Sequence, residues 1–437
     1  MHEEAAVLRA RRAEVMHRLG AGAAIIPAAP HALRSGDSHH RYRPSSDLLF
    51  LTGFCEPEAV CVLAPQHAEH PFVLFVRPRD PEREVWDGPR AGVEGAREIF
   101  GADAAFPIGE LDTRLPSFLR GAEELHVALG QDEDFDRRVL RAARAARVAE
   151  RKGISAPRRF GDLALLLGEM RLRKSEREIL RLRAAASATR DAHLEAMRAA
   201  RPGVLEYEIE ALLLAAFRRH GGEPGYTPIV AAGANATVLH YVANRARLRD
   251  GELLLIDAGA EIDWYTADVT RTFPVGPGFS DAQKALYGVV LAAQRAAILA
   301  VRPGATIEKI HALTVETITR GMLDIGLLSG DATEIIEKEL YKRFYMHRTS
   351  HWLGMDVHDV GGYFVRGQPR PLEPGMVLTV EPGIYVPERA AEVDARFCGI
   401  GVRIEDDVLV TADGNDVLTG DIPKEIADLE AISAARA

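Results

Sequence analysis

The sequence predicts two domains, an α/β domain over residues 1–170 and an α+β domain over residues 171–437. The first observation is length, because 437 residues exceed what one hydrophobic core usually organises. The second is a change in pattern, since helical and strand-like pieces alternate in the first third and separate into runs afterwards. The third is a helix-start signal, S-x-x-E at Ser175 and Glu178, which marks the beginning of the second unit.

The first domain opens with an amphipathic helix, expected over residues 4–19. Short apolar runs with strand character follow this helix. They cover residues 23–26, 59–63 and 72–76. Alternation of helices and strands over this length favours an α/β domain that ends near residue 170.

The second domain is expected to contain four long helices, two of which are closed by Gly or Pro pairs. They cover residues 175–199, 204–220, 280–301 and 306–327. Between them, and from residue 347 to about residue 418, the chain has short β-rich segments broken by Gly and Pro. Helices and strands in separate runs indicate an α+β class.

Composition restricts the classes of function. Apolar residues make up 47% and charged residues 27% of the chain, as in ordinary soluble globular proteins. The formal net charge of -10 disfavours broad nucleic-acid binding. One basic stretch, residues 137–159, has no aromatic side chain for stacking a base, so we interpret it as a solvated helical face.

The chain is expected to be cytoplasmic. It has no run of about 20 apolar residues that could span a membrane. The charged first residues lack the apolar centre of a signal peptide. The three cysteines, Cys55, Cys61 and Cys398, are too sparse for a disulfide framework and form no C-x-x-C pair.

Two aspartates in the segment GELLLIDAGAEIDWYTADVTRTF are candidate metal ligands. Asp257 ends an apolar strand, and Asp268 lies in a second strand expected over residues 266–273. A hairpin would place the two carboxylates opposite each other, where like charges repel unless a cation lies between them. The alternative is that both aspartates cap turns.

The segment MHRTSHWLGMDVHDVGG contains three histidines, His347, His351 and His358. A neutral imidazole is a common metal ligand, and His351 is the candidate for that role. His358 can form a hydrogen bond with a substrate or a ligand. The alternative for each histidine is a satisfied position in the core.

Two glutamates also stand at the ends of apolar strands, Glu381 in EPGMVLTVEPGIYV and Glu405 in GIGVRIEDDVLV. Four carboxylates and one histidine suit divalent cations, with the imidazole favouring Mn, Co or Zn. Bridging carboxylates commonly hold two metals, which make hydroxide available near neutral pH and polarise a carbonyl. The sequence therefore predicts a hydrolytic centre with two divalent cations.

The segments IDAGAEIDWYTADVTRTF, SHWLGMDVHDVGG, LTVEPGIY and VRIEDDVLV, in this order, resemble the pita-bread metallopeptidases. This family includes Xaa-Pro aminopeptidase (aminopeptidase P), prolidase and methionine aminopeptidase, and the chain most resembles bacterial aminopeptidase P. The stretch RSGDSHHRYRPSSDLLFLTGFCEPEAV is similar to the first domain of that enzyme. The resemblance covers nearly the whole chain and implies a pita-bread catalytic domain over residues 171–437.

The resemblance assigns the ligands of two divalent cations, for which Mn is expected and Zn or Co are possible. It gives Asp257 to one metal, Asp268 and Glu405 to both, and His351 and Glu381 to the second. A hydroxide bridging the metals would attack the Xaa-Pro carbonyl, and Glu381 would be the general base. The expected reaction releases the N-terminal residue from peptides with proline in the second position.

The resemblance also implies roles around the substrate. His240 is expected to stabilise the tetrahedral intermediate and His358 to contact the substrate near the scissile bond. Further residues are expected to line the substrate cleft or to support it. They are Tyr226, His347, Tyr385 and Arg403 in the second domain, with Trp86 and Asp37 in the first.

Trp86 and Asp37 match positions that reach the cleft of a neighbouring subunit, so a homo-oligomer, a tetramer or a dimer, is expected. The alternative is a half-buried tryptophan and a turn aspartate. Prolidase, which cleaves only Xaa-Pro dipeptides, stays open as the alternative activity, because Arg403 could also clamp a proline carboxylate. A non-catalytic binding protein with this fold is less expected, since every ligand position is kept.

Overall fold

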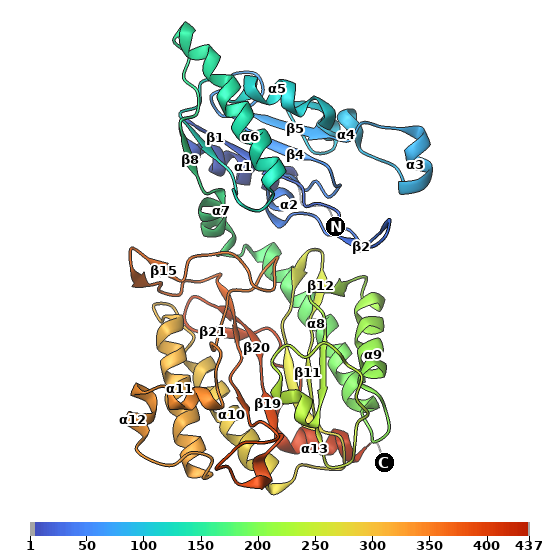
Figure 1. Ribbon diagram of the computed structural model, residues 1–437, viewed down its shortest axis with the longest axis vertical. Coiled ribbons are helices and arrows are strands. Elements are labelled where there is room, and N and C mark those ends of the chain that lie inside the picture. The colour runs from blue at the N-terminus through green and yellow to red at the C-terminus, as the bar shows by residue number, and fades with distance from the viewer. Residues whose placement is uncertain (1–4, 436–437) are drawn as a thin grey trace. The chain divides into compact units, whose positions relative to one another are not determined.

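The computed structural model describes residues 5–435 and divides into two compact units, residues 1–170 and 171–437 (Figure 1). The first helix, expected over residues 4–19, is α1 (Ala5–Leu19), and Glu4 lies outside the described residues. Within residues 5–435, no helix combines the length and the apolar character needed to cross a membrane.

The first unit is built on a six-stranded sheet in the order β6-β5-β4-β1-β7-β8. β4 is antiparallel to both of its neighbours, whereas the outer pairs β5–β6, β1–β7 and β7–β8 are parallel. Parallel neighbours need crossover connections, and helices provide them. The strands are β1 (Gly22–Pro27), β4 (Val60–Leu63), β5 (Phe72–Val76), β6 (Ala104–Pro107), β7 (Glu124–His126) and β8 (Arg159–Gly161).

Helices cover both faces of this sheet. Successive strand residues point to opposite faces, so apolar side chains on both faces need a covering layer. Val73 of β5 belongs to a core that includes residues of α5 and α6. Its neighbour Phe72 points the other way, where the guanidinium of Arg12 in α1 lies 4.0 Å from the ring centroid. The predicted α/β class of the first domain is therefore confirmed. The other helices of the unit are α2 (Ser46–Thr52), α3 (Pro81–Asp87), α4 (Gly92–Glu98), α5 (Leu111–Phe118), α6 (Glu133–Ala146) and α7 (Leu163–Arg171).

The described part of the second unit contains three three-stranded antiparallel sheets, β10-β11-β14, β17-β20-β21 and β13-β12-β9. The antiparallel pair β18-β19 accompanies them. The strands are β9 (Glu223–Pro224), β10 (Ile229–Ala232), β11 (Leu253–Asp257), β12 (Ala260–Ile262), β13 (Tyr265–Thr266), β14 (Thr270–Pro274), β17 (Val377–Val380), β18 (Gly383–Tyr385), β19 (Gly401–Arg403), β20 (Asp406–Val410) and β21 (Asn415–Val417).

Two pairs of helices pack on these strands, α8 with α9 and α10 with α11. In Figure 1, α8 and α9 lie beside β11, and α10 and α11 lie on the other side of the domain. The predicted start of α8, the first helix of the second unit, is confirmed, because Glu178 Oε2 accepts a hydrogen bond from the Ser175 N–H at 2.8 Å. The helices are α8 (Glu176–Ala199), α9 (Glu206–Arg219), α10 (Asp281–Ala300) and α11 (Ile307–Asp324).

The strand expected over residues 266–273 is divided, which corrects the sequence-based prediction. β13 ends at Thr266 and β14 begins at Thr270, so Asp268 lies between strands and Asp257 pairs with Thr270 instead. The Asp268 N–H leaves the strand ladder and donates to the two oxygens of Asp407 at 3.3 and 3.2 Å. The hairpin still returns the chain to the side of Asp257.

Candidate metal centre and active site

β11 and β14 direct Asp257 and Asp268 to the face of the strands that points away from the helices. Ile256 of β11 and Phe273 of β14 belong to the core shared with α8, α9 and α10. Since successive side chains alternate along a strand, Asp257 and the paired Thr270 point the opposite way. Asp268 precedes β14 and comes to the same place, since the Tyr226 hydroxyl lies within 2.6 Å of an oxygen of each aspartate.

β17 and β20 bring Glu381 and Glu405 to the same face. Val380 and Val408 belong to the core formed with α10 and α11. Glu381 follows β17 and Glu405 precedes β20, and Val380 pairs with Asp406 in this antiparallel ladder. The two glutamates therefore lie at the same end of the sheet.

His351 completes the group. Its Nε2 lies 3.3 Å from Asp268 Oδ2 and 3.4 Å from Glu381 Oε1. Its Nδ1 lies 3.0 Å from the carbonyl oxygen of Trp352, so Nδ1 carries the proton and Nε2 faces the carboxylates. One ligand atom from each of Asp268, His351 and Glu405 lies within 4.8 Å of the others.

The electrostatics of this acidic group are those of buried carboxylates that repel one another. Burial raises the pKa of Glu381 to about 7, and burial with the neighbouring carboxylates holds the pKa of Glu405 well above its ordinary value. Burial also raises the pKa of Asp257. Burial alone lowers the pKa of His351, yet its hydrogen bond to Asp268 and the charge of Glu381 raise it to about 9. Buried oxygen ligands that repel one another, with an imidazole among them, fit divalent cations.

Hydroxyl groups contact three of these carboxylates. Thr270 Oγ1 donates to Glu405 Oε2 at 2.6 Å. The Tyr226 hydroxyl, which has one proton to donate, lies 2.6 Å from Asp257 Oδ1 and 2.5 Å from Asp268 Oδ1. Hydrogen bonds of this kind to a metal ligand fix the direction of its lone pairs.

Arg403 is buried against the acidic group, with only 4% of its surface exposed. Its Nη2 donates to Asp257 Oδ2 at 2.5 Å, and its Nε donates to Thr270 Oγ1 at 2.9 Å. Its Nη1 donates to the Tyr385 hydroxyl at 3.0 Å. Arg403 therefore supports the ligands, and three of its nitrogens are engaged within the protein.

The hydrogen-bond chain continues from Tyr385 to His347. His347 Nδ1 lies 2.8 Å from the carbonyl oxygen of Arg348 and must donate to it. His347 Nε2 then accepts from the Tyr385 hydroxyl, 2.8 Å away. Burial lowers the pKa of His347 to about 3, so the imidazole is neutral at physiological pH.

The other two predicted histidines are exposed beside this group. The ring of His358 packs edge-on against the ring of His351, with centroids 4.4 Å apart. Asp359, next to His358, is held by buried ion pairs with Arg171 and Lys174 at 2.5 and 3.0 Å. His240 is near enough for its charge to lower the pKa of both His347 and His358, although burial is the larger cause in each.

Trp86 and Asp37 belong to the first unit. Trp86 lies on α3 and is 85% exposed. Asp37 is exposed in the turn between β2 (Leu33–Ser35) and β3 (Ser38–His39). Trp86 is therefore not half-buried, whereas Asp37 lies in a turn, as the alternative expected. The role of both residues at a neighbouring subunit stays a prediction.

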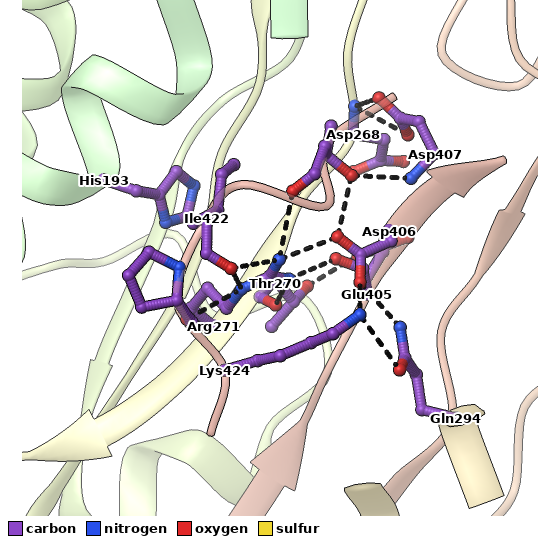
Figure 2. A network of polar contacts seen from close by, with 12 residues as sticks. His193, Asp268, Thr270, Arg271, Gln294, Glu405, Asp406, Asp407, Ile422 and Lys424 are labelled. Carbon is purple, nitrogen blue, oxygen red and sulfur yellow. Dashed lines mark hydrogen bonds and ion pairs between the residues drawn. The ribbon is translucent and has the colours of Figure 1, made fainter. Parts of the chain in front are cut away.

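A second polar layer, which the sequence did not predict, lies behind the ligands (Figure 2). Arg271 Nη2 pairs with Asp406 Oδ1 at 2.7 Å, and Nη1 donates to the carbonyl oxygen of Glu405 at 2.5 Å. Asp406 Oδ2 also accepts from Lys424 Nζ at 2.5 Å and from Gln294 Nε2 at 2.7 Å. The sequence pattern could have indicated this layer, because consecutive residues such as Glu405 and Asp406 point to opposite faces of a strand.

Comparisons with known proteins agree with this geometry. Two family models match, Metallopeptidase family M24 over residues 181–412 and Aminopeptidase P, N-terminal domain over residues 8–127. The Xaa-Pro aminopeptidase of Escherichia coli (strain K12) is 42% identical over 431 residues, which cover 98% of this chain and 97% of that protein.

Solved structures are similar over the full length. The aminopeptidase PepP of Pseudomonas aeruginosa has a TM-score of 0.96 and 49% identity, covering 100% of this chain and 99% of that one. The zinc-substituted aminopeptidase P of Escherichia coli in complex with product has a TM-score of 0.95 and 40% identity, with 100% of both chains covered.

Fold and site together define a metallopeptidase, which is a hydrolytic enzyme. The chain belongs to metallopeptidase family M24 and carries the N-terminal domain of the aminopeptidase P type. The pita-bread fold predicted from the four sequence segments is thereby confirmed.

Proposed function

We propose that this enzyme releases the N-terminal residue from peptides that carry proline in the second position. The single observation that carries the proposal is the group of buried carboxylates around His351, a set of donors that would suit a two-metal hydrolytic centre. The full-length similarity to proteins named Xaa-Pro aminopeptidase supports the substrate class.

Asp257, Asp268, His351, Glu381 and Glu405 would hold two divalent cations, and Mn is the expected metal. When bound, such cations lower the pKa of water to near neutrality and polarise a carbonyl oxygen. The mixed oxygen and imidazole donors suit Mn, and Zn or Co would also fit.

Glu381 is the proposed general base. Its Oε1 lies 3.3 Å from the Thr379 hydroxyl, which donates to it, and 3.4 Å from His351 Nε2. Its Oε2 lies 3.6 Å from His347 Nδ1. A carboxylate held in this way can take a proton from the attacking water and pass it to the leaving proline nitrogen, a contribution of about 10²–10⁴-fold.

The exposed histidines are proposed to act on the substrate. His240 would donate a hydrogen bond to the oxygen of the tetrahedral intermediate, and His358 would contact the peptide around the scissile bond. Tyr226 and His347 would line the cleft, and Tyr385, which is 1% exposed, would support it through its hydrogen bonds with His347 and Arg403. The Xaa-Pro bond lacks an N–H, so recognition must come from the ring shape and the free amine, for which Asp257 is the expected partner.

Prolidase activity is the second candidate, and the contacts of Arg403 disfavour it. A dipeptidase needs a cation to clamp the proline carboxylate. Arg403 was the candidate clamp, but it is 4% exposed, and its nitrogens already bond Asp257, Tyr385 and Thr270. This arrangement supports cleavage of longer peptides.

Assembly and location remain proposals. We expect a homo-oligomer, a tetramer or a dimer, in which Trp86 and Asp37 reach the cleft of a neighbouring subunit, and a cytoplasmic location. Trp86 exposes 85% of its surface, and tryptophan is enriched at protein interfaces. Light scattering tests the assembly, and a fully active monomer would contradict it.

The deciding experiment compares three peptide classes with the Mn-loaded enzyme: Xaa-Pro-Yaa, Xaa-Ala-Yaa and the dipeptide Xaa-Pro. We expect rapid release of Xaa from Xaa-Pro-Yaa, slower cleavage of the dipeptide and little cleavage of Xaa-Ala-Yaa. Cleavage of the dipeptide alone would establish prolidase instead. Equal cleavage of Xaa-Ala-Yaa would remove proline specificity from the proposal.

A further inference from the structure

His240 is carried by a loop that lacks regular strands. This His240 loop, residues 233–246, begins with a 3-10 turn over Gly233–Thr237 after β10. Near its tip, Val238 and Val242 are 55% and 54% exposed, and His240 is also exposed. An exposed loop of this kind needs anchoring contacts at its base if it is to hold one side chain in place.

Glu206, the first residue of α9, supplies such contacts and has no exposed surface. Its Oε1 accepts hydrogen bonds from the Ala232 N–H at 2.8 Å and from Asn235 Nδ2 at 3.0 Å. Its Oε2 accepts from the Tyr241 hydroxyl at 2.8 Å and from the Ala246 N–H at 2.7 Å. One carboxylate therefore holds two points before His240 and two points after it.

The four donors to Glu206 are uncharged, which distinguishes it from the buried ion pairs of this domain. A buried carboxylate is stable only when its lone pairs are satisfied, and hydrogen bonds to a charged group are about twice as strong as neutral ones. The Glu206 N–H also donates to the carbonyl oxygen of Ala246 at 2.9 Å. The end of the loop is thus joined to α9 in both directions.

Further contacts keep the base of the loop near the proposed active site. Asn244, which is 1% exposed, donates from Nδ2 to Glu210 Oε2 at 3.0 Å, one turn along α9 from Glu206. A Cβ atom on Gly401 would lie 2.2 Å from the carbonyl oxygen of Ala236, so the loop packs directly on β19. The same strand carries Arg403.

We propose that Glu206 is a positioning residue, which acts on the reaction by holding the His240 loop in the geometry that brings His240 to the substrate. The proposal rests on the role proposed above for His240. In this proposal α9, which packs with α8 on the strands, supports the loop that carries His240.

A double-mutant cycle in the Mn-loaded enzyme tests this role. Glu206→Gln replaces one acceptor oxygen by an NH₂ group that faces donors, so at least one anchor is lost. We expect kcat on an Xaa-Pro-Yaa peptide to fall about tenfold with KM little changed, since misplacement by about 1 Å can reduce a rate by up to 10²-fold. In a His240→Ala background, the same substitution is expected to change kcat less than about twofold.

The matched control is Glu208→Gln, the same chemical change two residues along α9 at an exposed position that bonds only its own helix start. Its kcat is expected to match that of the wild type. Hydrogen exchange gives a second measurement: Glu206→Gln should speed exchange in residues 232–246 and leave β17 and β20 unchanged. If Glu206→Gln does not fold, Tyr241→Phe removes one anchor and carries the same cycle.

The outcomes separate the two proposals. If His240→Ala leaves kcat unchanged, the proposed role of His240 is wrong. If His240→Ala lowers kcat but Glu206→Gln has no effect, or reduces kcat by the same factor in both backgrounds, the positioning role of Glu206 is overturned.

Discussion

Arg271 and Asp406 form an ion pair at 2.7 Å in which neither side chain is exposed. The pair lies on the helix side of β14 and β20, and the carbonyl oxygen of Glu405 accepts a further hydrogen bond from Arg271 at 2.5 Å (Figure 2). Arg271 also donates to the carbonyl oxygen of Ile422 at 3.0 Å. The strands that carry candidate ligands are therefore joined from behind by a guanidinium.

The first prediction concerns this pair. Asp406→Asn leaves the charges of Arg271 and Lys424 without their buried partner, and losses of this kind destabilise by about 3–5 kcal/mol. We expect a decrease of that size in the free energy of unfolding, measured by urea titration. Glu425→Gln, which removes an exposed ion pair with Arg295, should change the same quantity by less than about 1 kcal/mol. An Asp406→Asn enzyme as stable as this control would show that the network contributes little.

The second prediction concerns Glu381. Glu381→Gln keeps the shape of the side chain, removes the proposed base and weakens a ligand. We expect kcat to fall by at least about 10²–10⁴-fold, with an unchanged circular-dichroism spectrum. Glu373→Gln is a suitable control, because Glu373 forms an exposed ion pair with Arg173 at 2.8 Å. A near-wild-type rate for Glu381→Gln would refute the assignment.

The third prediction is metal dependence. Chelation should abolish activity, and Mn²⁺ should restore it at least as well as Zn²⁺. Metal should also raise the melting temperature, since a ligand that binds only the folded state stabilises it. The measurement is activity and thermal unfolding of stripped protein with each metal added back. Full activity of rigorously metal-free protein would exclude the two-metal mechanism.

The sequence predicted much of this site because strand ends are visible in it. Asp257, Glu381 and Glu405 each terminate or precede an apolar run. The structure brings Glu381 and Glu405 beside His351, and it brings Asp257 to the Tyr226 hydroxyl that also contacts Asp268. The position of Asp268 within a continuous strand was wrong, since its N–H bonds the Asp407 side chain, a contact across 139 residues. Contacts at such separation leave no periodic signal.

The buried supports were not predictable for the same reason. In the sequence, Arg271 is a charged residue in a short strand, a type that usually faces solvent. Its partners in the structure are Asp406 and the carbonyl oxygen of Ile422. Glu206 reads as a common helix-start glutamate, but it bonds a loop up to 40 residues away. In each case the charged side chain is explained by a tertiary partner, which local propensity does not contain.

The fourth prediction is a pH dependence of stability due to His193. This residue of α8 is fully buried, and its Nε2 donates to the carbonyl oxygen of Ala258 at 3.0 Å. Among the described residues its Nδ1 has no hydrogen-bond partner. Burial lowers the pKa of His193 from 6.5 to about 4. Between these values the unfolded chain binds the proton and the folded one does not, so stability falls as pH decreases.

His193→Gln keeps a donor for Ala258 and removes the titration. The loss of unfolding free energy between pH 6.5 and pH 4.5 should therefore be smaller than in the wild type by about 2–3 kcal/mol. The exposed His17 on α1 provides the control, and His17→Gln should leave the slope unchanged. A His193→Gln slope equal to that of the wild type would show that His193 is protonated in the folded state.

The last prediction distinguishes a supporting role of Arg403 from a substrate clamp. If Arg403 bound the carboxylate of a dipeptide, Arg403→Gln would raise KM for Xaa-Pro alone and leave Xaa-Pro-Yaa unaffected. The guanidinium instead bonds Asp257 and Tyr385, so its loss should disturb the ligand and the His347 chain whichever peptide is bound. We expect kcat/KM to fall by about 10–10²-fold and by the same factor for both peptides, because one charge-assisted bond contributes about 1.5–3 kcal/mol. The two substrates are measured side by side with each variant.

Tyr385→Phe removes only the hydroxyl and should give a smaller loss of kcat/KM that is again equal for the two peptides. A rise in KM for the dipeptide alone would instead restore the prolidase interpretation.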